Sequence, residues 1–332
     1  MRRNPRCIEH SGPGVTNTSS ETRRFAAIDI GTNTILLLVA EMDRGGAFRV
    51  LEDRAEITRL GKGVDRSRLI GVEGEKRSLD TLRSYLELCE SLEVADIAAV
   101  GTSVLRDARN AGDFQERVQR ELGLNLRVLS GEEEASYSYL AVQKGLRLEG
   151  RELLVVDVGG GSTELIWGRD GGLYRWASLD LGSVRLTERY LQSDPVLEEE
   201  CARLIVMVDR ELQTLLADWG EGAHFQVMVG IAGTFTTLGA IEKGLTRYSH
   251  SQVHGSFLSR VEIRRQMALF KTKTVAERKR IPGLEPQRAD VILAGTLLID
   301  RMIELFRIER VLISDQGVRF GLLYERLGKQ RR

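Results

Sequence analysis

The chain has only three cysteines, Cys7, Cys89 and Cys201, which are odd in number and far apart. Such a set fits neither a disulfide framework nor a zinc site, which favours a reducing cytosol. No stretch approaches the roughly 18 consecutive apolar residues of a membrane span, so we expect a cytoplasmic protein without membrane contact. The formal net charge is zero. The net charge therefore does not indicate a class of partner, and any anion-binding site must come from a local group of residues.

Other signatures of chemistry are missing as well. The sequence contains no Gly-x-Ser-x-Gly elbow and no Cys/His nucleophile arrangement. His250 and His254 lie four residues apart, but the neighbouring serines and Gly255 predict a loop rather than a zinc-binding helix.

The chain of 332 residues is long for a single core and predicts two domains. Its first 22 residues are polar, include Gly12, Pro13 and Gly14, and lack an apolar h-region. Residues 1–23 are therefore predicted to form a disordered leader rather than a signal peptide.

Two similar segments, one in each half of the chain, are the most informative. Each is an apolar strand ending in an aspartate, then a turn rich in glycine and hydroxyl residues, then a second apolar strand. The first is Phe25–Val39 with Asp29, and the second is Leu153–Trp167 with Asp157. Such a pair places N–H and hydroxyl donors on opposite walls of a cleft, each beside a carboxylate. That arrangement suits a polyanion held with a divalent cation.

The apolar pattern predicts the same order of elements twice, three strands followed by alternating helices and strands. In the first half we expect strands at 25–30, 35–41, 47–52, 96–101 and 126–129, and helices at 73–92, 104–109, 112–123 and from 131. In the second half we expect strands at 152–158, 163–168, 173–178, 226–231 and 310–314, and helices at 195–218, 261–270, 274–280, 287–307 and 317–327. Turns at 43–46 and 169–172 join the opening strands of each half. These strands are therefore antiparallel, which argues against a Rossmann domain.

The strongest motif is Gly159-Gly160-Gly161-Ser162-Thr163. Three consecutive glycines let backbone N–H groups close on a phosphate, and the two hydroxyls add donors. Asp157 and Glu164 flank the motif and can hold Mg²⁺ directly or through water. A hairpin with a glycine bulge is the alternative. This alternative is less favoured because a similar turn, Gly31-Thr32-Asn33-Thr34, follows the first strand.

A second candidate lies at the predicted helix start Ser130-Gly-Glu132-Glu133-Glu134. Ser130 and Glu133 have the spacing of a capping box. Glu134 lies about 100° further round the helix, so it can point into the cleft and act as a general base on water. The alternative is that all three acids complement the helix dipole.

Two further loops each join a strand to a helix, where donors gather at a positive helix end. In Gly101–Asn110, Arg106 is a candidate phosphate clamp, although most exposed helix arginines are only solvated. In Gly233-Thr234-Phe-Thr236-Thr237, a threonine N-cap explains the pattern equally well.

The stretch 260–280 contains eight Lys and Arg residues against two acids, Glu262 and Glu277. A long polyanion would need such a track, but a solvated helix face is the commoner explanation. The single aromatic residue there, Phe270, leaves no stacking platform for nucleic acid.

These motifs together resemble the exopolyphosphatase / guanosine pentaphosphate phosphohydrolase family, over about residues 25–325. The segments that carry the resemblance are Ile28–Thr34, Gly101–Ala108, Leu129–Ala135, Asp157–Glu164, Gly233–Leu238, Arg288–Ile292 and Ile313–Arg319. The resemblance implies an α/β fold of duplicated actin-like ATPase / sugar-kinase (ribonuclease H-like) domains flanking a central cleft. We expect domain I at 24–131 plus 316–332 and domain II at 132–315, with crossings near 128–134 and 314–318. A homodimer is also implied.

The resemblance also assigns roles to the candidate residues. Glu134 would be the general base, and Arg106 would be a catalytic residue that contacts phosphate. Asp157 and Glu164 would bind Mg²⁺ or Mn²⁺, and Asp29 is a further candidate ligand. The candidate substrate contacts are Thr32, Asn33, Thr34, Gly160, Gly161, Ser162, Thr163, Gly233 and Thr234.

The chain departs from the family pattern in three places. Thr34 stands where the family commonly has Ser, and Phe320 where it usually has Glu. The latter puts a substrate role for that position in doubt. The chain also lacks the C-terminal helical HD-type domain of longer members, which would shorten an anion track.

We therefore expect an exopolyphosphatase that uses Mg²⁺ to release the terminal phosphate of inorganic polyphosphate. Hydrolysis of the 5′-terminal phosphate of guanosine pentaphosphate (pppGpp) is the nearest alternative, and the sequence does not separate the two. A kinase of the same superfamily, and a regulator that binds polyphosphate or an alarmone without turnover, are more remote alternatives. The first lacks a recognisable adenosine pocket motif, and the second is disfavoured by the carboxylates at Glu134, Asp157 and Glu164.

Overall fold

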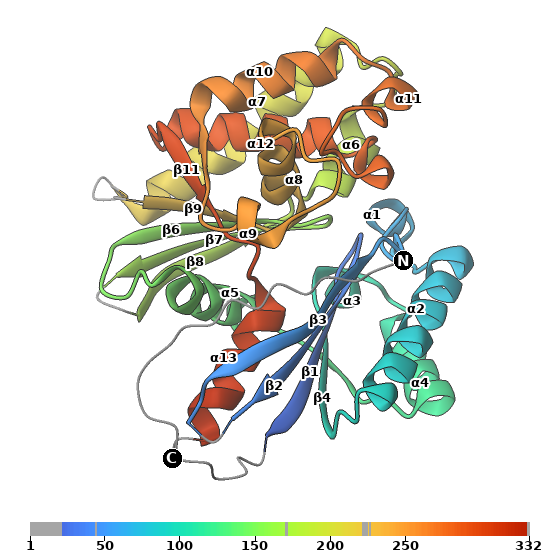
Figure 1. The fold of residues 1–332 in the computed structure, drawn as a ribbon. Coiled ribbons are helices and arrows are strands. Elements are labelled where there is room, and N and C mark those ends of the chain that lie inside the picture. Colours follow the sequence, from blue (N-terminus) through green and yellow to red (C-terminus); the bar gives the residue numbers. More distant parts are fainter. Residues whose placement is uncertain (1–21, 44, 170–171, 221–224, 226, 331–332) are drawn as a thin grey trace.

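The computed structural model describes residues 22–43, 45–169, 172–220, 225 and 227–330. Residues 1–21 of the predicted leader, residue 44 and residues 170–171 of the predicted turns, and residue 226 of a predicted strand lie outside these ranges. Arg23, expected in the leader, instead begins the first strand, where it pairs with Met42. Two β-sheets with helices on their faces make up the fold (Figure 1).

The first sheet has five strands in the order β3-β2-β1-β4-β5. They are β1 (Arg23–Ile30), β2 (Ile35–Met42), β3 (Phe48–Glu56), β4 (Asp96–Gly101) and β5 (Leu126–Val128). As expected, β1 and β2 are antiparallel, and β1 pairs in parallel with β4. Alternate residues of β1 face opposite sides of the sheet. Ala26 and Ile28 pack with α2 (Val72–Ser91) and α4 (Ala111–Leu122), whereas Phe25 and Ala27 face α13 (Val318–Gln330).

The second sheet repeats this order and adds one strand at its edge, β10-β11-β9-β6-β7-β8. Its strands are β6 (Leu153–Val158), β7 (Thr163–Arg169), β8 (Gly172–Leu179), β9 (Val227–Ile231), β10 (Phe257–Ser259) and β11 (Arg310–Ile313). The repeated order, with three antiparallel strands followed by parallel ones, confirms the predicted duplicated α/β fold. We call each sheet with its covering helices a half of the molecule.

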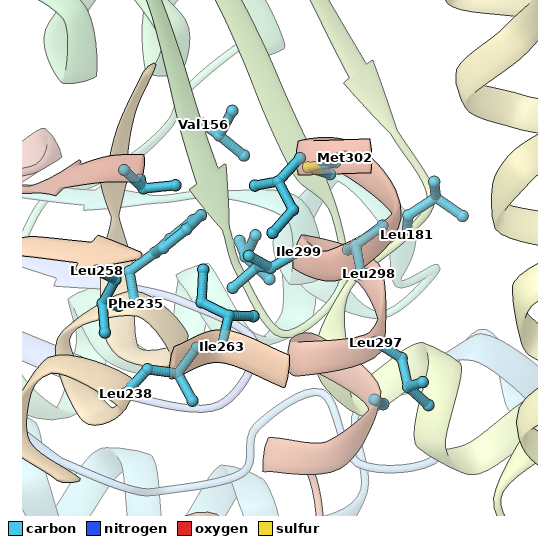
Figure 2. Close-up of a cluster of buried hydrophobic side chains, with 14 of the residues drawn as sticks. Val156, Leu181, Phe235, Leu238, Leu258, Ile263, Leu297, Leu298, Ile299 and Met302 are labelled. Carbon is cyan, nitrogen blue, oxygen red and sulfur yellow. The ribbon is translucent and has the colours of Figure 1, made fainter. Parts of the chain in front are cut away.

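The second half carries the larger apolar core. Phe235 and Leu238 of α8 (Ala232–Glu242) and Ile263 of α10 (Arg260–Lys271) pack with Ile299 of α12 (Ile292–Leu305) and Val156 of β6 (Figure 2). The other elements of this half are α6 (Ser183–Tyr190), α7 (Glu198–Trp219), α9 (His250–Val253), α11 (Val275–Arg278) and the 3₁₀ turn η1 (Pro286–Arg288). Among the described residues, no helix combines the length and the apolar character needed to cross a membrane.

Two helices lie between the sheets (Figure 1). α5 (Gly131–Leu146) places Ala135 and Tyr139 on the second sheet. α13 packs Leu323 on the first sheet, so the last helix returns to the first half, as the family resemblance implies. Phe320 is buried in the same core, which removes it from substrate contact. The domain boundaries at 131/132 and 315/316 stay a prediction.

The structure differs from the sequence-based expectation mainly in short elements. α1 (Val64–Ser67), α3 (Ser103–Asp107), α6, α9 and β10 are short, and only α3 was expected in part. The helix expected over 287–307 is broken into η1 and α12, and the one expected over 274–280 is only α11. His250 begins α9 rather than lying in a loop.

The contact between α13 and α5 makes Gly321 sensitive to substitution. A Cβ at Gly321 would lie 2.2 Å from the carbonyl oxygen of Tyr137 in α5. Gly321→Ala is therefore expected to lower the free energy of unfolding by about 1–3 kcal/mol in urea denaturation. Gly328→Ala on the same helix is the control, because a Cβ there meets nothing within 4 Å. It should be neutral or raise stability by up to about 1 kcal/mol. Equal stability of the two variants would contradict this helix contact.

Candidate active site

A cleft of about 670 Å³ lies between the two halves. The turn after β1, the glycine-rich turn after β6, the start of α5 and the turn before α8 all contribute to its walls. The predicted site residues that line it are Asp29, Thr32, Asn33, Thr34, Glu134, Asp157, Gly160, Gly161, Ser162, Glu164 and Gly233.

The glycine-rich turn is held from behind by α6. The carbonyl oxygens of Gly159 and Gly160 accept from the N–H groups of Ser183 and Val184, both at 2.9 Å. The carbonyl of Gly161 accepts from Nε of Arg185 at 2.7 Å. In a trans peptide the C=O and the following N–H point in opposite directions. The N–H groups that follow these carbonyls therefore face away from α6 and toward the cleft, and none donates to another described residue. Three such groups in a row form an anion-binding concavity.

A side chain at either of two glycines in this turn would crowd the opposite wall of the cleft. A Cβ at Gly161 would lie 2.6 Å from Oγ of Ser103 and 2.8 Å from Oγ1 of Thr32. A Cβ at Gly160 would lie 3.1 Å from Cβ of Thr32. The two predicted turns therefore touch one another across the cleft, one from each half.

Strand register places the carboxylates of the second half side by side. Asp157 on β6 is opposite Glu164 on β7, which is opposite Ser178 on β8. Oε1 of Glu164 accepts from the hydroxyls of Ser162 and Ser178, both at 2.8 Å. Asp157 accepts from the hydroxyl of Ser138 at 3.3 Å. The sequence reasoning missed Ser138 and Ser178, although the predicted hairpin register could have located Ser178.

Burial dominates the acidity of these groups. It raises the pKa of Asp157 well above its ordinary value, and the neighbouring charges of Glu164 and Asp29 add to the shift. Burial also raises the pKa of Glu164, although hydrogen bonds from Ser178 and Ser162 oppose it. A positive charge in the cleft would relieve this cost.

Two buried polar atoms at the cleft have no partner among the described residues. They are Oδ1 of Asp29 and Nδ2 of Asn33. Burial raises the pKa of Asp29 to about 6, against the opposing charge of Arg319. An acceptor and a donor left unpaired at one wall fit a site that takes up a ligand.

Glu134 lies in the cleft, and its neighbour Glu133 completes the predicted capping box. Glu133 N–H donates to Oγ of Ser130 at 3.1 Å, and Ser130 N–H donates to Oε2 of Glu133 at 2.9 Å. Glu134 is 7% exposed and accepts from Nη1 of Arg106 at 2.7 Å. Burial, with the charge of Glu164, raises the pKa of Glu134 well above its ordinary value. Arg106 also lies 3.9 Å from Glu164, so it joins the two carboxylates.

Arg288 is a half-buried cation of the cleft to which the sequence reasoning gave no role. Its Nη2 donates to Oγ1 of Thr34 at 3.2 Å. Its guanidinium lies so close to Gly233 that a Cβ there would meet Nη1 at 2.1 Å. Burial lowers the pKa of Arg288.

Two predicted substrate contacts do not line the cleft. Thr163 is fully buried, and its hydroxyl donates to the carbonyl of Leu181 at 2.8 Å. Thr234 is buried, and a Cβ at Gly295 would lie 2.7 Å from its methyl group. Both hydroxyls therefore lie inside the second half.

A cluster of paired charges occupies one edge of the cleft. His250 and His254 both bind Asp315, the latter with Nδ1 at 3.2 Å from Oδ1. Arg319 donates to both oxygens of Asp53 at 3.0 Å. Burial opposes ionisation of Asp315, but hydrogen bonds from the two histidines hold its pKa far below the usual range. The two histidines are thus part of a cluster of ion pairs around Asp315.

Four of the eight basic residues in the stretch 260–280 pair with neighbouring acids. Its ion pairs are Arg260–Glu304, Arg264–Asp300, Arg265–Glu262 and Lys271–Glu198. Arg278 is buried and donates to the carbonyl of Phe270 at 2.8 Å. The structure favours a paired helix face over a track for a long polyanion.

Comparison with known proteins identifies relatives that are named as phosphatases. Exopolyphosphatase 2 of Mycobacterium tuberculosis is 32% identical over 311 residues, 90% of this chain and 97% of the relative. The guanosine-5′-triphosphate,3′-diphosphate pyrophosphatase of Vibrio cholerae is 29% identical over 91% of this chain. The bifunctional 3-dehydroquinate synthase/phosphatase of Fusobacterium nucleatum is 29% identical over 90%. The chain spans only 59% and 46%, respectively, of the length of the last two.

A solved structure shares the whole fold. The crystal structure of the Aquifex aeolicus member of the Ppx/GppA protein family has a TM-score of 0.79 and 35% identity, covering 94% of this chain and 99% of that one. The family model described as the Ppx/GppA phosphatase family matches residues 38–330. The chain therefore belongs to the Ppx/GppA phosphatase family, whose named relatives are phosphoanhydride hydrolases.

Proposed function

We propose that this chain hydrolyses the terminal phosphoanhydride bond of inorganic polyphosphate and releases orthophosphate. The observation that carries the proposal is the position of Glu134, a buried carboxylate in the same cleft as three unpaired amides of the glycine-rich turn. Phosphoryl transfer needs mainly positioning and charge stabilisation from the protein. These groups can supply both.

Glu134 is the proposed general base. Burial raises its pKa, which makes its carboxylate a stronger base than an exposed glutamate. The hydrogen bond from Arg106 fixes one of its oxygens. The other oxygen is left to orient and deprotonate the attacking water. The amides of Gly160, Gly161 and Ser162 would neutralise non-bridging phosphate oxygens.

Asp157 and Glu164 are the proposed ligands of Mg²⁺ or Mn²⁺, with Asp29 as a third candidate. No group of three or more His, Cys, Asp or Glu side chains within the described ranges is arranged to hold a metal ion by itself. Mg²⁺ commonly uses one or two carboxylates together with water and substrate phosphates, so two adjacent carboxylates fit it. The unpaired oxygen of Asp29 and the raised pKa values of its neighbours support the same assignment. The ion would offset charge that develops on the phosphate.

Hydrolysis of the 5′-terminal phosphate of pppGpp is the second candidate function. The same base and amides would serve it, and the name of the Vibrio cholerae relative favours it. The kinase and the non-hydrolysing regulator remain more remote. They predict phosphate transfer to a sugar acceptor, and tight binding without phosphate release, respectively.

A phosphate-release assay with both substrates tests the proposal and its metal requirement. With Mg²⁺ or Mn²⁺, we expect release from polyphosphate with a higher kcat/KM than from pppGpp. Removal of the metal with EDTA should abolish release, and Mg²⁺ in excess should restore it. Higher kcat/KM for pppGpp would establish the second function instead. Release that persists in EDTA would overturn the metal assignment, and no release from either substrate would overturn hydrolysis.

A further inference from the structure

Arg185 of α6 connects the glycine-rich turn with the opposite half of the molecule. Its side chain is 4% exposed. Nε donates to the carbonyl of Gly161 at 2.7 Å. Nη1 donates to Asp65 on α1, and Nη2 donates to Asp107 at the end of α3; both helices belong to the first half. One planar group thus has three hydrogen-bond partners, two of which belong to the first half.

The bond to Gly161 acts on the anion-binding amides. The C=O of Gly161 and the N–H of Ser162 belong to one rigid peptide plane. Holding the carbonyl against α6 therefore aims the Ser162 N–H at the cleft. Among the described residues, only the N–H of Gly182, at 3.2 Å, also binds this carbonyl. Arg185 makes the shorter of the two bonds.

The carboxylates fix where the guanidinium lies. Asp65 is on α1 and Asp107 ends α3, and their side chains are 13% and 23% exposed. A buried guanidinium is costly without paired charges. If the halves moved apart, Arg185 would lose both carboxylates at once, and Asp180, at 3.5 Å and 74% exposed, would be its remaining acidic partner among the described residues. Because an arginine fork is planar and its donors are fixed, a shift of the group also shifts the Nε–H that binds Gly161.

We propose that Arg185 is a positioning residue that couples the approach of the two halves to the orientation of the glycine-rich turn. When Asp65 and Asp107 close on the guanidinium, its Nε–H holds the Gly161–Ser162 peptide with the amide aimed at the bound phosphate. The proposal rests on the proposed hydrolase function but assigns a residue that contacts neither the substrate nor the metal.

Arg189 provides a matched control on the same helix. It lies one turn after Arg185 and also pairs with Asp65, through Nε and Nη2. It does not contact the glycine-rich turn, and its side chain is 43% exposed. A simple electrostatic tie between the halves would make both arginines important, whereas positioning of the turn requires only Arg185.

The test measures kcat and KM for Mg²⁺-dependent phosphate release from polyphosphate, together with Tm, in the full chain. Arg185→Met is expected to lower kcat at least tenfold at a temperature where it is fully folded, on the order expected when reacting groups are misplaced by less than 1 Å. Arg185→Lys should remain impaired, because an ammonium cannot bind Gly161 and both carboxylates in the same plane. Arg189→Met should stay within about threefold, as expected of an exposed ion pair.

A double-mutant cycle separates coupling from local damage. Asp107→Asn alone should impair turnover less than Arg185→Met, and should add nothing in the Arg185→Met background. Unchanged kcat and KM in folded Arg185→Met would overturn the proposal, as would equal losses in Arg185→Met and Arg189→Met. If Arg185→Met does not fold, Asp107→Asn and Arg185→Lys decide in its place, and wild-type kinetics in both would overturn the proposal. Absence of phosphate release by the wild-type chain would instead overturn the proposed function.

Discussion

Glu134→Gln is expected to lower phosphate release at saturating polyphosphate by about 10²–10⁴-fold, the usual contribution of general base catalysis. The amide keeps the size of the side chain and can still lie beside Arg106, but it cannot accept a proton from water. Because the rest of the cleft is unchanged, KM should move little. Single-turnover assays with Mg²⁺ and polyphosphate measure the effect.

Glu132→Gln is the matched control for this prediction. Glu132 lies in the same first turn of α5 but is exposed. It should retain kcat within about threefold, since a lone surface charge acts weakly through solvent. Undiminished release by Glu134→Gln would remove Glu134 from the role of base. Equal losses in both variants would point to the charge of the helix end instead.

Gly182→Ala is expected to lower kcat/KM by about 10²-fold or more. A Cβ at Gly182 would lie 2.1 Å from the carbonyl oxygen of Gly160 and 2.4 Å from the carbonyl carbon of Gly161. Both are backbone atoms of the anion-binding turn, so the turn must shift by about 1 Å to make room. A displacement of that size at a catalytic site costs about two orders of magnitude. Steady-state kinetics on polyphosphate measure it.

Gly112→Ala carries the same chemical change without the contact. A Cβ at Gly112, near the start of α4, meets nothing within 4 Å. Its kinetics should equal those of the wild type, and its Tm should be equal or slightly higher because alanine favours the helix. Full activity in Gly182→Ala would mean that the amide positions do not matter for turnover.

Local pattern was enough to predict two α/β halves with mixed sheets, because each sheet begins with an apolar hairpin joined by a glycine-containing turn. The actin-like form of the halves came from the resemblance to a known family. The elements that local pattern missed depend on distant partners. α6 has one turn signal, Gly182, and its first residues bind carbonyls of the glycine-rich turn more than 20 positions earlier. The sequence does not predict the break before α12, because no proline or glycine lies between Arg288 and Ile292.

The residues of the candidate site likewise fall into those that local sequence can predict and those that depend on distant partners. Glu134 could be predicted because a capping box assigns Glu133 to the helix end and leaves its neighbour free. The prediction that Thr163 contacts the substrate could have been avoided. Adjacent residues of a strand face opposite sides of the sheet, so Thr163 must point inward if Glu164 faces the cleft. Arg185 could not be inferred, since its carboxylate partners lie about 80 and 120 positions earlier in the chain.

The register that joins Asp157 to Glu164 has a counterpart in the first half that lacks the second acid. There Asp29 is opposite Leu36, which also lines the cleft. The two halves thus have the same strand pairing but different charges at the equivalent position. The two walls of the cleft therefore carry different charges. A linear anion with two identical ends would find unequal walls, one with paired carboxylates for a cation and one with an acid beside an aliphatic side chain. A cation bound by the paired carboxylates would therefore lie on the side of the second half, whichever end of the anion enters the cleft.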